Sequence, residues 1–311
     1  MTPDRRRVLL IAGPTASGKS AVALDVAGRV HGEIINADSM QVYRDLRILS
    51  ARPSVDDEGA LPRHLYGFMD ASTACSAAHW ARIAVQEIEA VWTRGHLPIV
   101  VGGTGLYFKA LTEGLSAIPD IPGINREAAR VFVEELGPEQ AHAHLADRDP
   151  RTAAGLKPTD PQRIARALEV LAATGRGLAD WQDAPAKPVL TADFVKVVLT
   201  PKKSDLTERS DSRFEQMVEQ EALDEVDRLM ARNLDSDLPI MKAVGVPPLM
   251  AHLRGDISLK EAVAQGLGQT RRYIKRQLTW ARTQMVSWNH ISTQQSKRKR
   301  KEILSLLSDQ A

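Results

Sequence analysis

The run Gly13-Pro14-Thr15-Ala16-Ser17-Gly18-Lys19-Ser20 is the feature that most constrains what this chain can fold into. It matches the pattern G-x-x-x-x-G-K-[S/T] in full, and an apolar segment, Val8–Ala12, precedes it. After it, valines recur at positions 22, 26 and 30, a spacing that predicts a helix over Lys19–Val30. A strand, a glycine-rich loop and a helix in this order predict a phosphate-binding loop, or P-loop.

This loop predicts a site for a phosphate or diphosphate group. Its glycines let backbone N–H groups face the anion, and the start of the helix adds about half a positive charge. Lys19 supplies a full charge, and the Ser20 hydroxyl is a ligand for Mg²⁺. We expect the anion to be bound by Gly13, Thr15, Ala16, Ser17, Gly18, Lys19 and Ser20.

Further apolar segments alternate with a helical one and predict an α/β fold. We expect strands at Glu33–Ala37, His64–Met69 and Leu97–Val101, and a helix at His79–Arg94. Such alternation is typical of a mainly parallel sheet with helices on both faces. Ligands of these sheets bind at the carboxyl ends of the strands, where Asp38 and the glycine-rich run 102–105 would join the P-loop.

The pattern changes at about Asp120, after which no strand is convincing for some seventy residues. Helices are predicted at Asn125–Leu136, Pro138–Asp147 and Pro161–Thr174, and a strand pattern returns at Phe194–Thr200. We therefore predict a P-loop core made of residues 1–120 and 191–311, with a helical insertion at 121–190.

Charge is distributed unevenly along the chain. The net charge is only +2, yet residues 262–301 hold ten Lys or Arg side chains and no Asp or Glu. Within this stretch, Arg271/Lys275 and Arg272/Arg276 are like-charge pairs four residues apart on a basic helix predicted over Leu259–Ser287. Such a face fits RNA phosphates or a diphosphate, unless carboxylates from elsewhere pair with it. The run Lys297–Lys301 fits either an RNA contact or a solvated, lysine-rich tail.

Cysteine content and hydropathy narrow the setting. A single cysteine, Cys75, excludes an intrachain disulfide and favours a reducing compartment. No apolar run approaches the roughly 18 residues that a membrane span needs. We expect a cytoplasmic chain with no membrane contact.

Asp38 opens a second candidate block, Asp38-Ser39-Met40-Gln41-Val42-Tyr43. A carboxylate at a strand end beside a P-loop acts as a magnesium ligand, as a general base or simply as a helix N-cap. Ser39 and Gln41 add neutral donors and acceptors, and a Gln amide suits the edge of a nucleobase.

Together these blocks resemble the tRNA dimethylallyltransferase family, also called tRNA isopentenyltransferases, in its bacterial form. The matching runs are GPTASGKS (13–20), the Asp38–Tyr43 block, VGGTGLYFKAL (101–111), DPQRIARALEV (160–170) and QTRRYIKRQLTWAR (269–282). The resemblance implies transfer of a dimethylallyl group from dimethylallyl diphosphate to N6 of the adenosine 3′ of the anticodon. It also implies Mg²⁺ as cofactor and an insertion that grips the anticodon arm.

The resemblance also implies roles for single residues. Asp38 would be the general base, Thr104 would contact the diphosphate oxygens and Arg209 would face the diphosphate. The residues expected to contact tRNA are Asp38, Ser39, Gln41, Thr104, Arg126, Gln162, Arg163, Arg166, Arg272 and Arg276. We expect a monomer without an obligate protein partner.

Other functions fit parts of the same sequence. A P-loop kinase of a nucleoside or small metabolite would share the GKS loop, but would need neither the Asp38–Tyr43 block nor the basic helix. A prenyltransferase of free adenine nucleotides would leave Arg163 and Arg166 without a task. A non-catalytic RNA-binding protein would leave Lys19 and Asp38 unexplained.

Overall fold

The computed structural model describes residues 6–54 and 61–309. These residues form one sheet of six parallel strands in the order β3-β2-β4-β1-β5-β6. The strands are β1 (Arg7–Ala12), β2 (Gly32–Asn36), β3 (Arg63–His64), β4 (Leu97–Gly102), β5 (Asp193–Leu199) and β6 (Asn289–Ile291). The predicted parallel α/β fold is confirmed. The third strand is shorter than expected, because after His64 only an isolated bridge between Tyr43 and Met69 continues the pairing.

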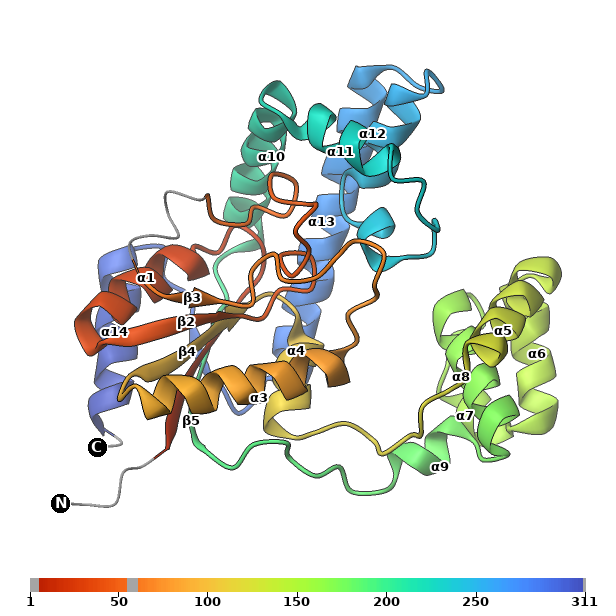
Figure 1. Ribbon diagram of the computed structural model, residues 1–311, viewed down its shortest axis with the longest axis horizontal. Helices are drawn as coiled ribbons and strands as arrows, with labels where there is room; N and C mark the ends of the chain where they lie inside the picture. The colour runs from red at the N-terminus through yellow and green to blue at the C-terminus, as the bar shows by residue number, and fades with distance from the viewer. Residues whose placement is uncertain (1–5, 55–60, 310–311) are drawn as a thin grey trace. The chain divides into compact units, whose positions relative to one another are not determined.

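The central strand β1 carries the P-loop, and its apolar residues are fully buried because both faces of the sheet are covered. Helices α1 (Lys19–Val30) and α14 (Ser296–Asp309) pack on one face (Figure 1). On the other face lie α3 (Ala77–Thr93) and α4 (Gly105–Thr112). The predicted helix Lys19–Val30 has the expected bounds.

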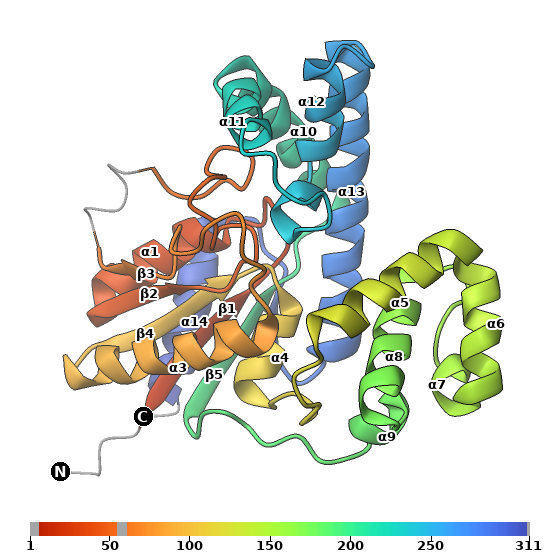
Figure 2. The same ribbon diagram turned by 45° about the vertical axis from the view of Figure 1, so that its right-hand side comes forward.

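A group of helices extends the sheet domain beside the carboxyl ends of its strands (Figure 2). Its members are α10 (Lys203–Glu219), α11 (Ala222–Met230), the short 3₁₀ helix η1 (Pro239–Lys242), α12 (Val246–Leu253) and α13 (Leu259–Gln284). The 26-residue α13 begins with a capping box between Ser258 and Glu261. None of the helices in the described ranges is both long enough and apolar enough to cross a membrane.

The chain divides into two compact units, Met1–Thr112 with Val189–Ala311, and Glu113–Pro188. The second unit is all-helical and has its own apolar core. Its helices are α5 (Gly123–Leu136), α6 (Pro138–Arg148), α7 (Pro150–Ala154), α8 (Pro161–Thr174) and α9 (Leu178–Gln182). In α8 the Asp160 side chain accepts a hydrogen bond from the Arg163 N–H, and Gly175 ends the helix in the left-handed region.

Candidate active site

The P-loop follows β1 and bends sharply before α1. Gly18, the N-cap of α1, has a φ of 80°, and Ala16 also has a positive φ of 63°. The loop is closed by bonds from Ser17 N–H and Lys19 Nζ to the Pro14 carbonyl, at 3.2 and 3.3 Å. Desolvation lowers the pKa of Lys19 to about 8, although nearby Asp38 acts in the opposite direction. A cation that lacks water in this way gains from a bound anion.

Asp38 lies just beyond the carboxyl end of β2, where Asn36 holds its backbone. The Asn36 side chain accepts from Asp38 N–H at 2.9 Å and donates to the Asp38 carbonyl at 3.1 Å. One carboxylate oxygen, Oδ1, accepts from Met40 N–H at 3.0 Å. Within the described ranges the other oxygen, Oδ2, accepts no hydrogen bond from the protein. Asp38 therefore has a fixed position and a free acceptor oxygen.

Thr104, after β4, joins the Asp38 block to the basic helix α13. Its Oγ1 accepts from Ser39 N–H at 2.9 Å and donates to Ser39 Oγ at 3.2 Å. The Tyr273 hydroxyl also hydrogen-bonds Thr104, and burial raises the pKa of Tyr273. The end of β4 and the segment after β2 lie so close together that a Cβ on Gly102 would lie 2.0 Å from the Ala37 carbonyl oxygen. Only glycine is tolerated at this position.

Gln277 on α13 connects the two glycine-rich loops. Its Oε1 accepts from Thr15 N–H at 2.9 Å, and its Nε2 donates to the Gly103 carbonyl at 3.0 Å. The side chain is almost fully buried. Sequence reasoning gave Gln277 no role, although it lies within the run 269–282 that carried the family resemblance.

A cavity of about 440 Å³ opens beside these loops. Its lining includes polar and charged groups from Lys19, Ser20, Asp38, Arg213 and Arg276. The remainder is largely apolar and includes Met40, Leu46, Leu49, Phe214, Met217 and Val244. Such a lining suits a ligand that has both a charged group and a hydrocarbon group.

Most of the expected core-unit site residues lie at this cavity. Thr15, Ala16, Ser17, Gly18, Lys19, Ser20, Asp38, Ser39, Gln41 and Arg276 line it. Gly13 and Thr104 are not part of the lining but contact lining residues. The Gln41 amide nitrogen, Nε2, donates to the Ser50 and Ala51 carbonyls at 2.9 and 3.1 Å. Its Oε1 is therefore the atom that can accept from a ligand.

Two arginines of α10 lie one turn apart, and the one that lines the cavity is not the one that the resemblance named. Arg209 is exposed and does not line the cavity, whereas Arg213, one helical turn further along, does. Desolvation lowers the pKa of Arg213, and its charge contributes to the lowered pKa of Lys19. The i, i+4 spacing of the two arginines in the sequence was the signal that could have found Arg213.

The basic face of α13 is partly paired with a carboxylate from another helix, the alternative that the sequence left open. Arg271 forms an ion pair with Asp211 of α10, with Nη2 and Oδ2 2.5 Å apart. Arg276 lies over the Tyr273 ring, 5.4 Å from its centroid, and reaches the cavity. Arg272 is exposed and, among the residues that the structure describes, makes no ion pair.

The candidate tRNA contacts of the helical unit lie on its surface. Arg126 on α5 and Gln162 on α8 are exposed. Arg163 is 71% exposed and its Nε lies 3.5 Å from Asp160 Oδ2, while Arg166 pairs with Glu169. The arginines of α8 thus have carboxylate partners within their own helix or its cap.

A magnesium ion would find few protein ligands here. No group of three or more His, Cys, Asp or Glu side chains suited to a metal occurs in the described part of the chain. Ser20 lines the cavity next to Lys19, as expected for a magnesium ion held mainly by phosphate oxygens. The donor set fits an ion that arrives with a diphosphate and takes Ser20 as its protein ligand.

Comparisons with known proteins agree with this geometry. The model of the family described as IPP transferase matches residues 41–284, and that described as isopentenyl transferase matches residues 6–66. The tRNA dimethylallyltransferase of Parvibaculum lavamentivorans is 52% identical over 97% of this chain and 96% of its own. That of Azorhizobium caulinodans is 53% identical over 90% of each chain.

Solved structures show the same similarity. The full-length tRNA isopentenylpyrophosphate transferase of Bacillus halodurans has a TM-score of 0.71 and 31% identity, with 98% of this chain and 96% of that chain covered. A eukaryotic dimethylallyltransferase acting on tRNA has a TM-score of 0.74 and 26% identity, with 90% of this chain and 71% of that chain covered.

Proposed function

Because the chain belongs to the IPP transferase family, together with the tRNA dimethylallyltransferases, we propose that it is a prenyltransferase acting on tRNA. It transfers the dimethylallyl group of dimethylallyl diphosphate to N6 of the adenosine 3′ of the anticodon. The observation that carries this proposal is one cavity in which a P-loop, a carboxylate with a free oxygen and apolar walls meet.

The P-loop binds the diphosphate of the donor. Its backbone N–H groups, the start of α1, Lys19 and Arg213 face the anion, and Thr104 orders the neighbouring loop. Negative charge grows on the leaving oxygen as the bond from C1 to that oxygen breaks, so these cations stabilise the transition state more than the ground state. Mg²⁺, bound through Ser20, supplies further positive charge to the diphosphate when it is present.

Asp38 accepts the proton that the adenine amine loses. N6 attacks C1, the C1–O electron pair leaves with the diphosphate, and a proton of N6 passes to Asp38 Oδ2. The neutral amine is a weak nucleophile, so a fixed acceptor oxygen beside it lowers the barrier. The base reaches the cavity only after it leaves its stack, which costs a few kcal/mol. Apolar lining such as Leu49 and Phe214 keeps water from the reacting carbon.

The tRNA contacts are part of the proposal. Ser39, Gln41, Arg272 and Arg276 meet the RNA near the cavity, and the 113–188 unit grips the anticodon arm through Arg126, Gln162, Arg163 and Arg166. Support comes from the exposure of most of these side chains. A tRNA substrate and a single cysteine favour a cytoplasmic location.

Incubation with labelled dimethylallyl diphosphate and bulk unmodified tRNA, followed by nucleoside analysis, tests the proposal. We expect label in an N6-substituted adenosine and nowhere else. Label in free adenine nucleotides, or ATP turnover without a prenyl donor, would instead favour one of the rival functions. The family membership already supports prenyl transfer over the kinase alternative.

A further inference from the structure

Helix α14 lies behind the P-loop and outside the segments that the family models match. Its apolar residues Ile303 and Leu307 pack into the same core cluster as Val22 and Val26 of α1. The pair between Arg300 Nη1 and Asp25 Oδ2, 2.7 Å apart, also joins α14 to α1. The basic run 297–301 is therefore docked on the P-loop helix.

Lys299 differs from its neighbours in this run. It is 2% exposed, whereas Lys297, Arg298 and Lys301 are exposed. Its Nζ donates to the Ser17 carbonyl at 2.7 Å and lies 3.3 Å from where a Cβ on Gly18 would be. Of the two interpretations of this run, an RNA contact or a solvated tail, neither describes Lys299.

Within residues 6–54 and 61–309, the charge of Lys299 has no oppositely charged partner. Among the residues that the structure describes, no carboxylate lies within ion-pair distance of it. Desolvation lowers the pKa of Lys299, and the charge of another cation, Arg209, lowers it further. Burying an unpaired charge is costly, and a neutral donor would serve the Ser17 carbonyl at less cost. The charge is explained if an anion binds on the other side of the loop.

The bond to Ser17 also has a geometric consequence. The peptide between Ser17 and Gly18 is trans, so its carbonyl and its N–H point in opposite directions. Lys299 holds the carbonyl from behind, and this directs the Gly18 N–H away from α14. Gly18 lines the cavity, and within the described ranges its N–H has no acceptor in the protein.

We propose that Lys299 is a positioning residue of the diphosphate site. From behind the P-loop it orients the Gly18 N–H toward the anion, and it adds a second layer of positive charge beneath the loop. This inference rests on the proposed function, because it requires a diphosphate in the P-loop.

The test is calorimetric titration of the full chain with inorganic pyrophosphate, without tRNA, for the parent and three variants. Lys299→Met removes the charge and the hydrogen bond, and Lys299→Gln keeps an N–H donor without the charge. Arg298→Met is the matched control, since Arg298 is 68% exposed on the same helix. Donor KM, kcat, tRNA affinity and melting temperature are measured on the same samples.

For Lys299→Met we expect pyrophosphate affinity to fall roughly tenfold or more, the usual size of a lost hydrogen bond to a charged group. Donor KM should rise to a similar extent, with tRNA affinity unchanged and the melting temperature unchanged or higher. Lys299→Gln should recover part of the loss, and Arg298→Met should match the parent.

Pyrophosphate affinity within twofold of the parent in a folded Lys299→Met would overturn the inference. So would an equal loss in Arg298→Met. If Lys299→Met does not fold, Lys299→Gln carries the test for the charge, and a pyrophosphate affinity within twofold of the parent would then overturn the role of that charge. A parent chain that binds no pyrophosphate at all would count against the proposed function rather than against the role of Lys299.

Discussion

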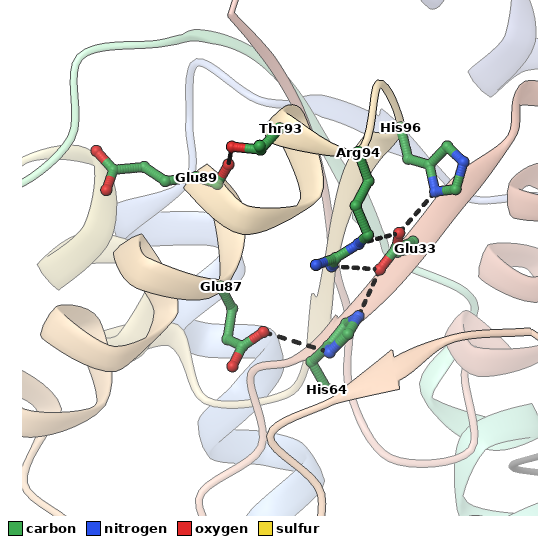
Figure 3. Close-up of polar contacts among 7 residues, drawn as sticks. All are labelled: Glu33, His64, Glu87, Glu89, Thr93, Arg94 and His96. Atoms are coloured by element: carbon green, nitrogen blue, oxygen red, sulfur yellow. Dashed lines mark hydrogen bonds and ion pairs between the residues drawn. The ribbon is translucent and has the colours of Figure 1, made fainter.

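Two carboxylates lie at opposite ends of β2, and their surroundings are opposite as well. Glu33, near the amino end, is buried and accepts hydrogen bonds from Arg94 Nε and Nη2 at 2.8 and 2.7 Å (Figure 3). His96 and His64 each approach it at 2.6 Å. Asp38, past the carboxyl end, accepts one backbone N–H on Oδ1.

The two ends of β2 thus differ in purpose: the carboxylate at the amino end stabilises the fold, and we propose that the one past the carboxyl end takes part in the reaction. Hydrogen bonds from Arg94 first, and then from His96 and His64, outweigh burial and lower the pKa of Glu33 to about 2. Its carboxylate has nothing left to offer a ligand. At the carboxyl end, Asp38, Lys19 and Arg213 lie at one cavity and form no ion pair with any residue in the described ranges, an arrangement that gains from a ligand. The paired cluster stabilises the sheet, and the unpaired one is available for reaction.

Asp38→Asn removes the charge of the carboxylate past the carboxyl end of β2, and it should have the largest effect on activity. We expect kcat to fall by about 10²–10⁴, the usual share of a general base. The amide keeps the shape and the bond from Met40, so melting temperature and tRNA affinity should hold. Steady-state kinetics with a tRNA titration measure this. A variant that loses tRNA affinity while kcat persists would contradict the assignment.

Glu33→Gln neutralises the carboxylate at the amino end of β2 and should affect stability rather than activity. It removes the negative charge and replaces one of the two acceptor oxygens that Arg94 and the two histidines share by an NH2 group, so the free energy of unfolding should fall by roughly 1.5–3 kcal/mol. Donor and tRNA affinities should stay at parental values, because the cluster lies at the other end of the strand. Urea unfolding followed by circular dichroism gives the change. Parental stability would show that the cluster contributes nothing to the fold.

The pH dependence of stability tests whether Glu33 acts as an ionised carboxylate. The pKa of Glu33 is about 2 in the folded chain against an ordinary value of 4.5. A carboxyl group with a lowered pKa stabilises the fold fully above its unfolded value, and this stabilisation is lost as pH falls toward the folded value. The stability gap between the parent and Glu33→Gln should therefore narrow from about pH 5 downward. A gap independent of pH would exclude an ionised Glu33 as its source.

The double variant Arg163→Ala with Arg166→Ala should have the smallest effect. Replacing both should weaken tRNA binding and reduce the slope of its salt dependence by at most about two. Because Arg166 is paired with Glu169, we expect Arg163 to account for most of the change. Affinities at three salt concentrations and a melting curve measure it. A lower melting temperature with an unchanged slope would assign both arginines to the internal structure of the helical unit.

Local signals predicted much of the fold. Helices α1 and α8 were predicted residue for residue, since Gly18, Asp160 and Gly175 are strong boundary signals. Helix α14 was not predicted, because its first half, Ser296–Lys301, is a charge run without an apolar period. The three residues of β6 are too few for any period to appear.

At the site, the P-loop and Asp38 could be found from their positions after strands, but contacts between distant segments could not. The pairs Arg271–Asp211 and Lys299–Ser17 join residues 60 and 282 positions apart. Such contacts depend on how helices pack, and a charged residue looks the same in sequence whether it is buried or solvated. The position of Arg213 at the cavity was missed for the same reason, since one turn of α10 decides which arginine reaches the cavity.

The most direct test measures single-turnover dimethylallyl transfer to tRNA for the parent, Asp38→Asn and Glu33→Gln, with both substrates saturating and below every melting temperature. We predict a parental rate for Glu33→Gln and a rate about 10²–10⁴-fold lower for Asp38→Asn. A parental rate for Asp38→Asn, or a loss of the same size in Glu33→Gln, would contradict the assignment of chemistry to the carboxyl end of the sheet.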